Sequence, residues 1–504
     1  MYISIKLFAL ILISFFNSCI YCLPILNETS STPLLLLISF DGFRWDYPDL
    51  YKLPNFNSLI QRGVRVKYIK NNFATVTFPL HYTIVTGLYE ETHGIVANTI
   101  YDPKLNATAT LDTMNDTKWW SQNSYSQPIW VSNQLANDSK QRRSGVIAWP
   151  GCDTPINSHL PYKYQSFNLN RKFDSIVKQI FDWFHEPIET RINFGVIYYP
   201  EPDITGHHYG PISNEMNETL KECDNYIGQL LKMIDNDEYL KTNLNIIITS
   251  DHGMEVIKKN HTIILEDYID ISLCSAYGSR AFVNIFVHSE SNIDRIYANL
   301  STIPNYEVYK KSQIPEEYHY KSNIRIGDIL FVGKAGYEII APGDNSSTEL
   351  LGDHGYNNVE SMYPIFYGFG PVFRQNMQAD PFHTVDIYSL MSYILKLEKR
   401  ITNGSLDNVK HILQGHLREK FFNEINLFVV NTAVNITHWG FITVGSVILV
   451  ILIGIIYIIV AFRHSRKLIY VESQNVPVRY RLLSTSEGSK NNLFADESDN
   501  EEIQ

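Results

Sequence analysis

Four continuous apolar runs in the first half of the chain are each followed by polar or turn residues. They cover residues 34–39, 145–149, 194–199 and 244–249. Apolar runs of this length, without alternation, are typical of strands buried on both faces of a parallel sheet. Helical patterns with one apolar face cover 55–62, 173–184, 214–235 and 385–397. The alternation of strands and helices predicts an α/β/α sandwich with a mostly parallel central sheet.

Acidic and histidine side chains cluster where three of these runs end. Asp41 follows the first run, Asp203 comes shortly after the third, and Asp251 and His252 follow the fourth. In α/β sheets, ligands bind beyond the C-terminal ends of the strands. One Asp-His pair by itself is more often a capped turn, but a second Asp-His-Gly occurs at 353–355 and an Asp-x-x-x-His begins at Asp203. Carboxylates together with imidazoles are a ligand set that suits zinc.

Thr77 stands where an extended segment turns into a predicted helix. Pro79 suits the first turn of a helix, and Gly87 suits its end. A hydroxyl there lies among free backbone N–H groups at the positive end of the helix dipole, which is a site for an anion such as phosphate. Most threonines in this position only cap a helix. The Asp and His residues elsewhere in the chain favour a catalytic role.

The two ends of the chain predict passage through a membrane. Residues 1–22 combine Lys6 with a short apolar core, the pattern of a cleaved signal peptide. Residues 440–462 are apolar, uncharged and long enough to span a bilayer. The basic run 463–467 places the C-terminal side in the cytoplasm. We expect a single-pass type I plasma-membrane protein, with 463–504 as its cytoplasmic tail.

The region between these segments reads as extracellular. We expect a catalytic domain over 23–400, with an insertion at about 255–345, followed by a stalk or a last packing element over 401–439. All glycosylation sequons precede the predicted span. They begin at Asn27, Asn106, Asn115, Asn137, Asn217, Asn260, Asn299, Asn345, Asn403 and Asn435.

The net charge and the cysteine content exclude some classes of protein. The net charge of −11 argues against a protein that binds a nucleic-acid backbone. After removal of the signal peptide, only Cys152, Cys223 and Cys274 certainly remain, so at most one disulfide forms among them and the pair stays open. The core must therefore come from burial of apolar side chains.

Six motifs in order carry a family resemblance. FDGFRWDY, TFPLHYTIVTGLYEETHGIVAN, WPGCD, YYPEPDITGHHYGP, TSDHGM and GDHGYNN resemble the nucleotide pyrophosphatase/phosphodiesterase family of the alkaline phosphatase superfamily. The resemblance covers about residues 34–397 and is greatest to the short type I membrane members. It implies an alkaline-phosphatase-like fold and hydrolysis of nucleotide phosphodiester and pyrophosphate bonds.

The resemblance also implies a site with two zinc ions. One zinc would be held by Asp203, His207 and His354, where the D-x-x-x-H spacing selects His207 over His208. The other would be held by Asp41, Asp251, His252 and Thr77, with Thr77 as the nucleophile that forms a nucleotidyl-threonine intermediate. Asn98 and the backbone N–H of Phe78 would donate to a phosphate oxygen.

The family pattern places several residues around the base. The expected substrate-binding residues are Phe78, Trp149, Asp153, Phe167 and Tyr198. Val76 and Thr99 stand where many members carry lysine, and Leu80 replaces the usual asparagine. Fewer cations near the phosphates predict that ATP is a poorer substrate than ADP or dinucleotides.

The sequence also allows two other functions. The protein would be a choline-phosphodiester or lysophospholipid hydrolase if the aromatic residues form a cage for a quaternary ammonium group. It would be an idle receptor or adhesion ectodomain if the site had lost its chemistry, but no ligand or nucleophile is missing. A phosphomonoesterase is disfavoured, because no arginine neighbours Thr77. The preferred nucleotide and the oligomeric state are left open.

Overall fold

A computed structural model describes residues 32–121, 123, 125–136, 141–258, 260–344 and 349–414. The predicted signal peptide, membrane span and cytoplasmic tail, and stalk residues 415–439, lie outside these ranges. Within them, no helix combines the length and apolar character needed to cross a bilayer.

The four predicted strands form the centre of an eight-stranded sheet with the order β19-β2-β18-β9-β1-β8-β6-β7. They are β1 (Leu34–Phe40), β6 (Ser144–Ile147), β8 (Phe194–Tyr199) and β9 (Leu244–Thr249). All four run parallel. The other strands are β2 (Gly63–Val66), β7 (Lys163–Gln165), β18 (Phe366–Phe369) and β19 (Met377–Ala379). Because β18 is antiparallel to both β9 and β2, the sheet is mixed, with a parallel centre.

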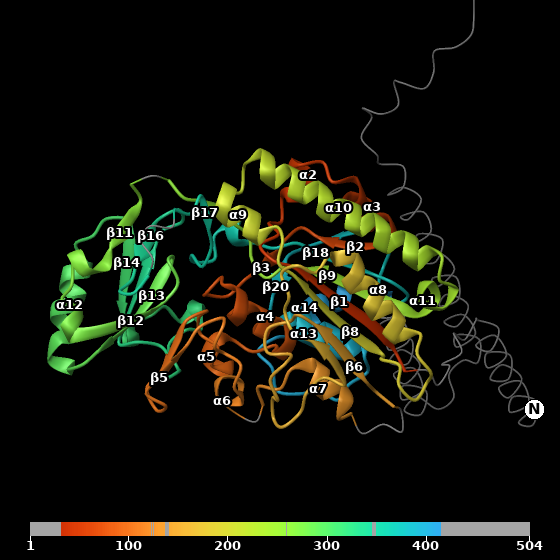
Figure 1. Cartoon of the computed structure of the whole chain (residues 1–504), viewed down its shortest axis with the longest axis horizontal. Helices are drawn as coiled ribbons and strands as arrows, with labels where there is room; N and C mark the ends of the chain where they lie inside the picture. Colours follow the sequence, from red (N-terminus) through yellow and green to blue (C-terminus); the bar gives the residue numbers. More distant parts are fainter. Residues whose placement is uncertain are drawn as a thin grey trace, which may run out of the picture. The chain divides into compact units, whose positions relative to one another are not determined.

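Helices cover both faces of the sheet (Figure 1). One layer contains α3 (Pro54–Arg62), α8 (Phe173–Phe184) and α10 (Asn214–Asp235), and the other contains α4 (Thr77–Thr86), α7 (Ile129–Gln134) and α13 (Asp386–Ile394). Successive side chains of β1 point to opposite layers: Leu36 and Ile38 pack with the first, whereas Leu35 and Leu37 pack with the second. Burial on both faces explains why the strand reads as an uninterrupted apolar run.

Shorter elements connect these layers. The strand pairs are β3 (Ile69–Lys70) with β20 (Phe382–His383), β4 (Ile100–Asp102) with β5 (Ala107–Ala109), and β10 (Glu255–Val256) with β17 (Gly352–Asp353). The short helices are α2 (Tyr47–Leu50), α5 (Glu90–His93), α6 (Thr117–Trp120), α9 (Asp203–Tyr209) and α11 (Glu238–Asn243).

The predicted insertion contains a sheet and a core of its own. Its antiparallel strands have the order β12 (Cys274–Gly278), β13 (Phe282–Val287), β15 (Ile329–Gly333) and β14 (Tyr306–Lys310). The helix α12 (Ile293–Leu300) packs on this sheet, and β11 (Thr262–Ile264) pairs with β16 (Glu338–Ile340). A separate apolar cluster, which includes Val283, Ile296 and Phe331, fills the space between them.

The catalytic domain extends beyond its predicted end at residue 400. The helix α14 (Leu406–Val409) and the 3₁₀ turn η7 (Lys410–Ile412) follow, and Val409, Ile412 and Leu413 are buried. The Arg374 N–H donates to the Ile412 carbonyl at 2.9 Å. Residues 401–414 therefore pack against the domain, as the last packing element that the sequence allows in place of a stalk, because apolar side chains at a spacing of three to four residues give this segment a face to bury.

The cysteines agree with a core that is built by burial of apolar side chains. Cys152, Cys223 and Cys274 are all buried free thiols, so none of them forms the disulfide that the sequence left open.

Among the described sequons, Asn217 is partly buried and the others are exposed. The exposed ones are Asn106, Asn115, Asn260, Asn299 and Asn403. Asn27, Asn137, Asn345 and Asn435 lie outside the described residues.

Candidate active site

The candidate ligands meet at the C-terminal edge of the parallel strands. Asp41 directly follows β1, Asp203 begins α9 after β8, and Asp251 and His252 follow β9. The register places Ser39 of β1 beside Tyr198 of β8 and Thr249 of β9, so the three strands end together. His354 does not follow a strand of this sheet but comes directly after β17.

Gly42 allows two of these segments to approach closely. Its backbone has a φ of +67°, and a Cβ atom at this position would lie 2.9 Å from the Cα atom of Asp203. The Gly42 N–H also donates to Asp251 Oδ1 at 3.2 Å. A larger residue would be strained and would push Asp41 away from Asp203, so the Asp-Gly pair at the end of the first strand is part of the site's geometry.

Three histidines share one hydrogen-bond pattern. The Nδ1 atoms of His207, His252 and His354 each lie 2.9 Å from a backbone carbonyl oxygen, of Gly352, Gly253 and Thr75 respectively. A carbonyl oxygen only accepts, so each Nδ1 carries the proton and donates it. In the neutral ring each Nε2 atom then keeps a lone pair, and this is the arrangement in which imidazole binds a metal ion.

These lone pairs face the carboxylates in two adjoining groups. In the first, Asp203 Oδ2 lies 3.4 Å from His207 Nε2 and Asp203 Oδ1 lies 3.5 Å from His354 Nε2. In the second, His252 Nε2 lies 3.4 Å from Asp41 Oδ1 and 3.0 Å from Asp251 Oδ2. The rings of His252 and His354 stack with centroids 3.5 Å apart, so the groups are neighbours. His207 lies in the first group, whereas His208 is exposed.

The buried carboxylates of the site require positive charge to balance them. Asp41 Oδ1, Asp203 Oδ1 and Asp251 Oδ2 are buried, and none accepts a hydrogen bond from the described residues. Burial, followed by the charges of Asp251 and Asp203, raises the pKa of Asp41 well above its usual value. Buried anions this close together destabilise a fold unless cations compensate them. The donor set and its geometry therefore fit bound metal ions.

Thr77 is the first residue of α4 and lies beside the second group. Its Oγ1 atom is 3.4 Å from His252 Nε2. The helix ends where Gly87 adopts a φ of +68°, as its sequence predicts. The hydroxyl is thus placed at the start of a buried helix, next to His252, Asp41 and Asp251.

Phe78 and Asn98 contact each other beside Thr77. The Phe78 N–H donates to Asn98 Oδ1 at 2.9 Å. In this structure the single Phe78 N–H proton is used by Asn98, and its donation to a phosphate oxygen stays a prediction. Its bond fixes Asn98 and leaves the Asn98 amide NH₂ as the donor of the pair.

Sequence reasoning missed His81, which contacts the backbone of Thr77. His81 lies one helical turn after Thr77, and its Nδ1–H donates to the Thr77 carbonyl at 2.8 Å. Its Nε2 atom is 2.9 Å from Ser39 Oγ, and Trp149 donates to its carbonyl at 3.2 Å. His81 Nδ1 is also 3.3 Å from Asp251 Oδ2, but a nitrogen that carries a proton offers no lone pair to a metal. The i, i+4 spacing from Thr77 is the signal that would have revealed it.

The expected aromatic residues divide into two sets. Tyr198 is partly buried and donates to Asp41 Oδ2 at 2.6 Å, and the ring of Phe167 lies 5.9 Å from the Tyr198 ring. Phe167 is 51% exposed, and Phe78 is partly buried, so these three rings are accessible. Trp149 is 1% exposed and packs edge-on against His81, so the prediction that it lines the substrate pocket is wrong. Asp153 is exposed.

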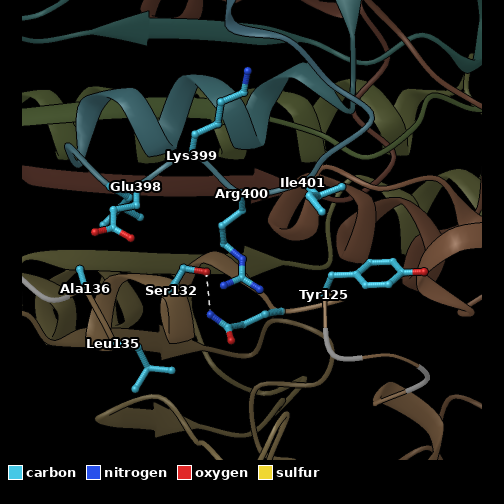
Figure 2. A pocket seen from close by; sticks show the side chains of 10 residues that line it. Tyr125, Ser132, Leu135, Ala136, Glu398, Lys399, Arg400 and Ile401 are labelled. Atoms are coloured by element: carbon cyan, nitrogen blue, oxygen red, sulfur yellow. Dashed lines mark hydrogen bonds between the residues drawn. The ribbon is translucent and has the colours of Figure 1, made fainter.

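A cavity of about 420 Å³ opens away from these residues. It lies between α7 and the segment after α13, and Figure 2 shows Arg400 extending into it toward Ser132. Glu398 and Arg400 carry opposite charges, and Leu135 and Ile401 are apolar. This mixed lining specifies no single ligand chemistry, and the cavity contains none of the candidate site residues.

Comparisons with known proteins agree with the geometry. The sequence matches the family described as type I phosphodiesterase / nucleotide pyrophosphatase over residues 35–357. Human ectonucleotide pyrophosphatase/phosphodiesterase family member 5 is 40% identical over 387 residues, which are 75% of this chain and 78% of the human protein. Mouse bis(5'-adenosyl)-triphosphatase enpp4 is 39% identical over 393 residues, which are 77% and 83% of the two chains.

Solved structures show the same fold. Murine ectonucleotide pyrophosphatase/phosphodiesterase 5 has a TM-score of 0.71 and 39% sequence identity, over 76% of this chain and 100% of the murine chain. An inactive variant of that murine protein, in which alanine replaces a threonine, is in complex with AMP and also has a TM-score of 0.71. The architecture is therefore the alkaline-phosphatase-like fold that the sequence predicts.

The matched range includes all of the candidate metal ligands, from Asp41 to His354. The chain thus belongs to the type I phosphodiesterase/nucleotide pyrophosphatase family and is a hydrolase of phosphodiester and pyrophosphate bonds.

Proposed function

We propose that the protein is a zinc-dependent enzyme of the cell surface that hydrolyses extracellular nucleotides through a covalent intermediate on Thr77. The observation that carries the proposal is the hydrogen-bond pattern shared by His207, His252 and His354. Each presents Nε2 to a buried carboxylate, and the cluster adjoins a threonine at a helix start. Carboxylate and imidazole ligands favour zinc over the harder cations, which prefer oxygen alone.

The residues divide into two proposed zinc sites. Asp203, His207 and His354 would hold one ion. Asp41, Asp251 and His252 would hold the other, with Thr77 Oγ1 completing it. Bound zinc ions supply Lewis acidity, which makes a threonine alkoxide accessible at neutral pH and stabilises charge on the phosphoryl oxygens.

The chain's own groups then carry the two displacements. Thr77 Oγ1 forms a bond to phosphorus as the bond to the leaving oxygen breaks, which leaves a nucleotidyl-threonine. Water then attacks phosphorus on the opposite side and releases Thr77. The Asn98 amide donates to a phosphoryl oxygen, and loss of one such donor costs on the order of 10²–10³ in rate. The N-terminus of α4 adds a positive dipole end beside the same oxygens.

The accessible aromatic rings suit a nucleobase. Tyr198 and Phe167 lie next to each other at the edge of the site, and Phe78 follows the nucleophile. Stacking on such rings contributes about 1–3 kcal/mol per base. The AMP complex of the murine relative and the name of the mouse bis(5'-adenosyl)-triphosphatase add support for adenine nucleotides. The proposed substrates are ADP, ATP, NAD and dinucleotides, with ATP disfavoured because Val76 and Thr99 carry no charge.

The proposed location is the plasma membrane, with the catalytic domain outside the cell. It rests on the predicted signal peptide over 1–22 and the predicted span over 440–462. The exposure of five sequon asparagines on the domain surface supports passage through the secretory pathway.

One assay on the full-length protein in membranes tests the proposal. p-Nitrophenyl-TMP and p-nitrophenyl-phosphorylcholine are compared, with EDTA treatment and zinc addition as further arms. We expect hydrolysis of the nucleotide ester only, loss of activity with EDTA and return of activity with zinc. Activity that survives Thr77→Ala would contradict the mechanism. Hydrolysis of the choline ester alone would select the choline-phosphodiesterase reading, and inertness toward both esters would select the receptor reading.

A further inference from the structure

The insertion contacts the loop that carries Asn98. This loop runs from α5 to β4, and the segment of the insertion that touches it is residues 318–326, which we call the clasp. We propose that the clasp positions Asn98 for phosphoryl transfer, with Tyr320 and Arg325 as its positioning residues. This inference rests on the proposed function, because it assigns a role within that same site.

Tyr320 ties the middle of the loop to the insertion's sheet. Its hydroxyl donates to the Val96 carbonyl at 2.7 Å and accepts from Asn284 Nδ2 at 2.9 Å. Asn284 belongs to β13, a central strand of that sheet, and both side chains are buried. One hydroxyl therefore connects a rigid strand to the backbone two residues before Asn98.

Arg325 holds the start of the same loop and the far end of β4, the strand that follows it. Its Nε–H donates to Asp102 Oδ2 at 2.9 Å, and one terminal nitrogen donates to the Gly94 carbonyl at 2.8 Å. The same nitrogen also donates to the Trp119 carbonyl at 2.9 Å. The guanidinium is buried, with a side-chain exposure of 0%. Because its donors lie in a rigid plane, Arg325 fixes Gly94 and Asp102 relative to each other.

Glu91 provides a third attachment just before the loop. Glu91 Oε2 accepts the backbone N–H groups of Lys321 and Ser322, each at 2.8 Å. In return, Asn323 Nδ2 donates to the Glu91 carbonyl at 3.0 Å. The loop is thus held before, within and after the stretch that leads to Asn98.

These attachments matter because the loop around Asn98 is not part of a helix or strand that would hold it in place. Residues 94–99 belong to no helix or strand, yet Asn98 Oδ1 must meet the Phe78 N–H at 2.9 Å beside Thr77. A displacement of about 1 Å in a group that acts on the transition state costs on the order of 100-fold in rate. Tyr320 and Arg325 touch no candidate ligand, so their effect on catalysis passes through the loop.

Tyr306 is a matched control within the same subdomain. Its hydroxyl donates to the carbonyls of Glu338 and His261 at 2.8 and 3.1 Å. Tyr306→Phe therefore removes a hydroxyl with two partners, as Tyr320→Phe does, but none of its partners lies in the loop that carries Asn98. A merely structural role of Tyr320 would make the two variants alike.

The experiment measures kcat, KM and thermal midpoint for the full-length chain with p-nitrophenyl-TMP. We expect Tyr320→Phe to lower kcat on the order of tenfold with little change in KM, since Asn98 acts in the transition state. Tyr306→Phe should leave kcat unchanged, with a similar loss of thermal midpoint. Glu91→Gln, which weakens an anionic acceptor without removing it, gives a second variant with a smaller fall in kcat.

A double-mutant cycle with Asn98→Ala locates the effect. If the clasp acts through Asn98, Tyr320→Phe adds no further loss of kcat in the Asn98→Ala background. Full additivity, equal kcat values for the two Tyr→Phe variants, or unchanged kcat in both Tyr320→Phe and Glu91→Gln would each overturn the inference. An inactive wild-type protein would instead contradict the proposed function.

Discussion

The ends of the parallel strands and the insertion contribute to one site in different ways. The strand ends provide charged side chains directly: Asp41 and Asp251 from buried positions just after β1 and β9, and Asp203 from the start of α9. The described residues of the insertion provide none of the candidate ligands, and hold the backbone of a loop through Tyr320 and Arg325. Chemistry is thus placed on the rigid sheet, while an added subdomain fixes the segment that the sheet leaves unsupported.

The two regions also differ in how well their buried charges are matched. At the strand ends, three carboxylate oxygens have no hydrogen-bond donor among the described residues. At the insertion, the Arg325 guanidinium is satisfied by Asp102 and by backbone carbonyls. We infer that the first region sacrifices stability for function, whereas the second stabilises the fold. The following predictions test this contrast.

The largest effect is expected for one of two adjacent histidines. His207→Ala removes a candidate ligand and should lower kcat/KM by more than about 10³-fold, beyond the loss of one oxyanion donor. His208→Ala alters an exposed ring and should leave kcat/KM near the wild-type value. Bound zinc, measured by atomic absorption after dialysis, should fall only in the His207 variant. Equal losses in the two variants would break the assignment of ligands.

A large loss of stability is expected where the insertion joins the loop. Asp102→Ala leaves the buried Arg325 charge unpaired and should lower the free energy of unfolding by about 3–5 kcal/mol. Asp235→Ala removes a comparable partner from Arg62, but that pair is about 40% exposed on both sides. Its loss should cost about 0–1 kcal/mol. Urea unfolding curves with a constant m-value provide the comparison.

A smaller effect concerns His93 at the base of the same loop. Burial lowers the pKa of His93 to about 3, whereas an unfolded histidine titrates near 6.5. Between these values the unfolded chain binds a proton that the folded chain does not, so stability falls as the pH decreases below 6.5. This single group should remove about 2 kcal/mol from the free energy of unfolding between pH 7 and pH 5. His93→Gln should show that much less pH dependence over the same range, and an unchanged slope would exclude His93 as its source.

The smallest predicted effect concerns the neutral residue beside Asn98. Thr99→Lys adds a partly exposed cation near the proposed phosphate position, and should raise kcat/KM for ATP relative to ADP by about threefold to tenfold. Thr99→Gln is a neutral control of increased size. Because the attraction is electrostatic, the gain should shrink as salt rises. A gain of the same size with glutamine would show that charge is not the cause.

The runs of apolar residues and the positions of the acidic residues after them predict the parallel part of the molecule well. β1 and β9 are buried on both faces, so their apolar runs are uninterrupted, and the acidic residues that follow lie together because parallel strands end at one edge. The insertion resists the same reasoning, because strands such as β14 are short and partly buried throughout. Such strands show neither an apolar run nor a clean alternation.

The contacts that the sequence does not predict share another cause. Trp149 was assigned to the pocket by motif, but burial beneath His81 depends on how α4 packs over the sheet, which no local pattern records. The bond between Phe78 and Asn98 likewise joins residues from two separate segments. Long-range packing decides such contacts, so a sequence read in windows identifies the chemical groups but not their partners.

The spread of the proposed ligands along the chain has a consequence for biosynthesis. Asp41 lies near the beginning of the domain, whereas His354 is made only after the insertion has been translated. A chain that stops within the insertion lacks His354, and it cannot complete the first metal group. Under the proposed ligand assignment, newly made protein therefore gains hydrolytic activity only when its domain is essentially finished.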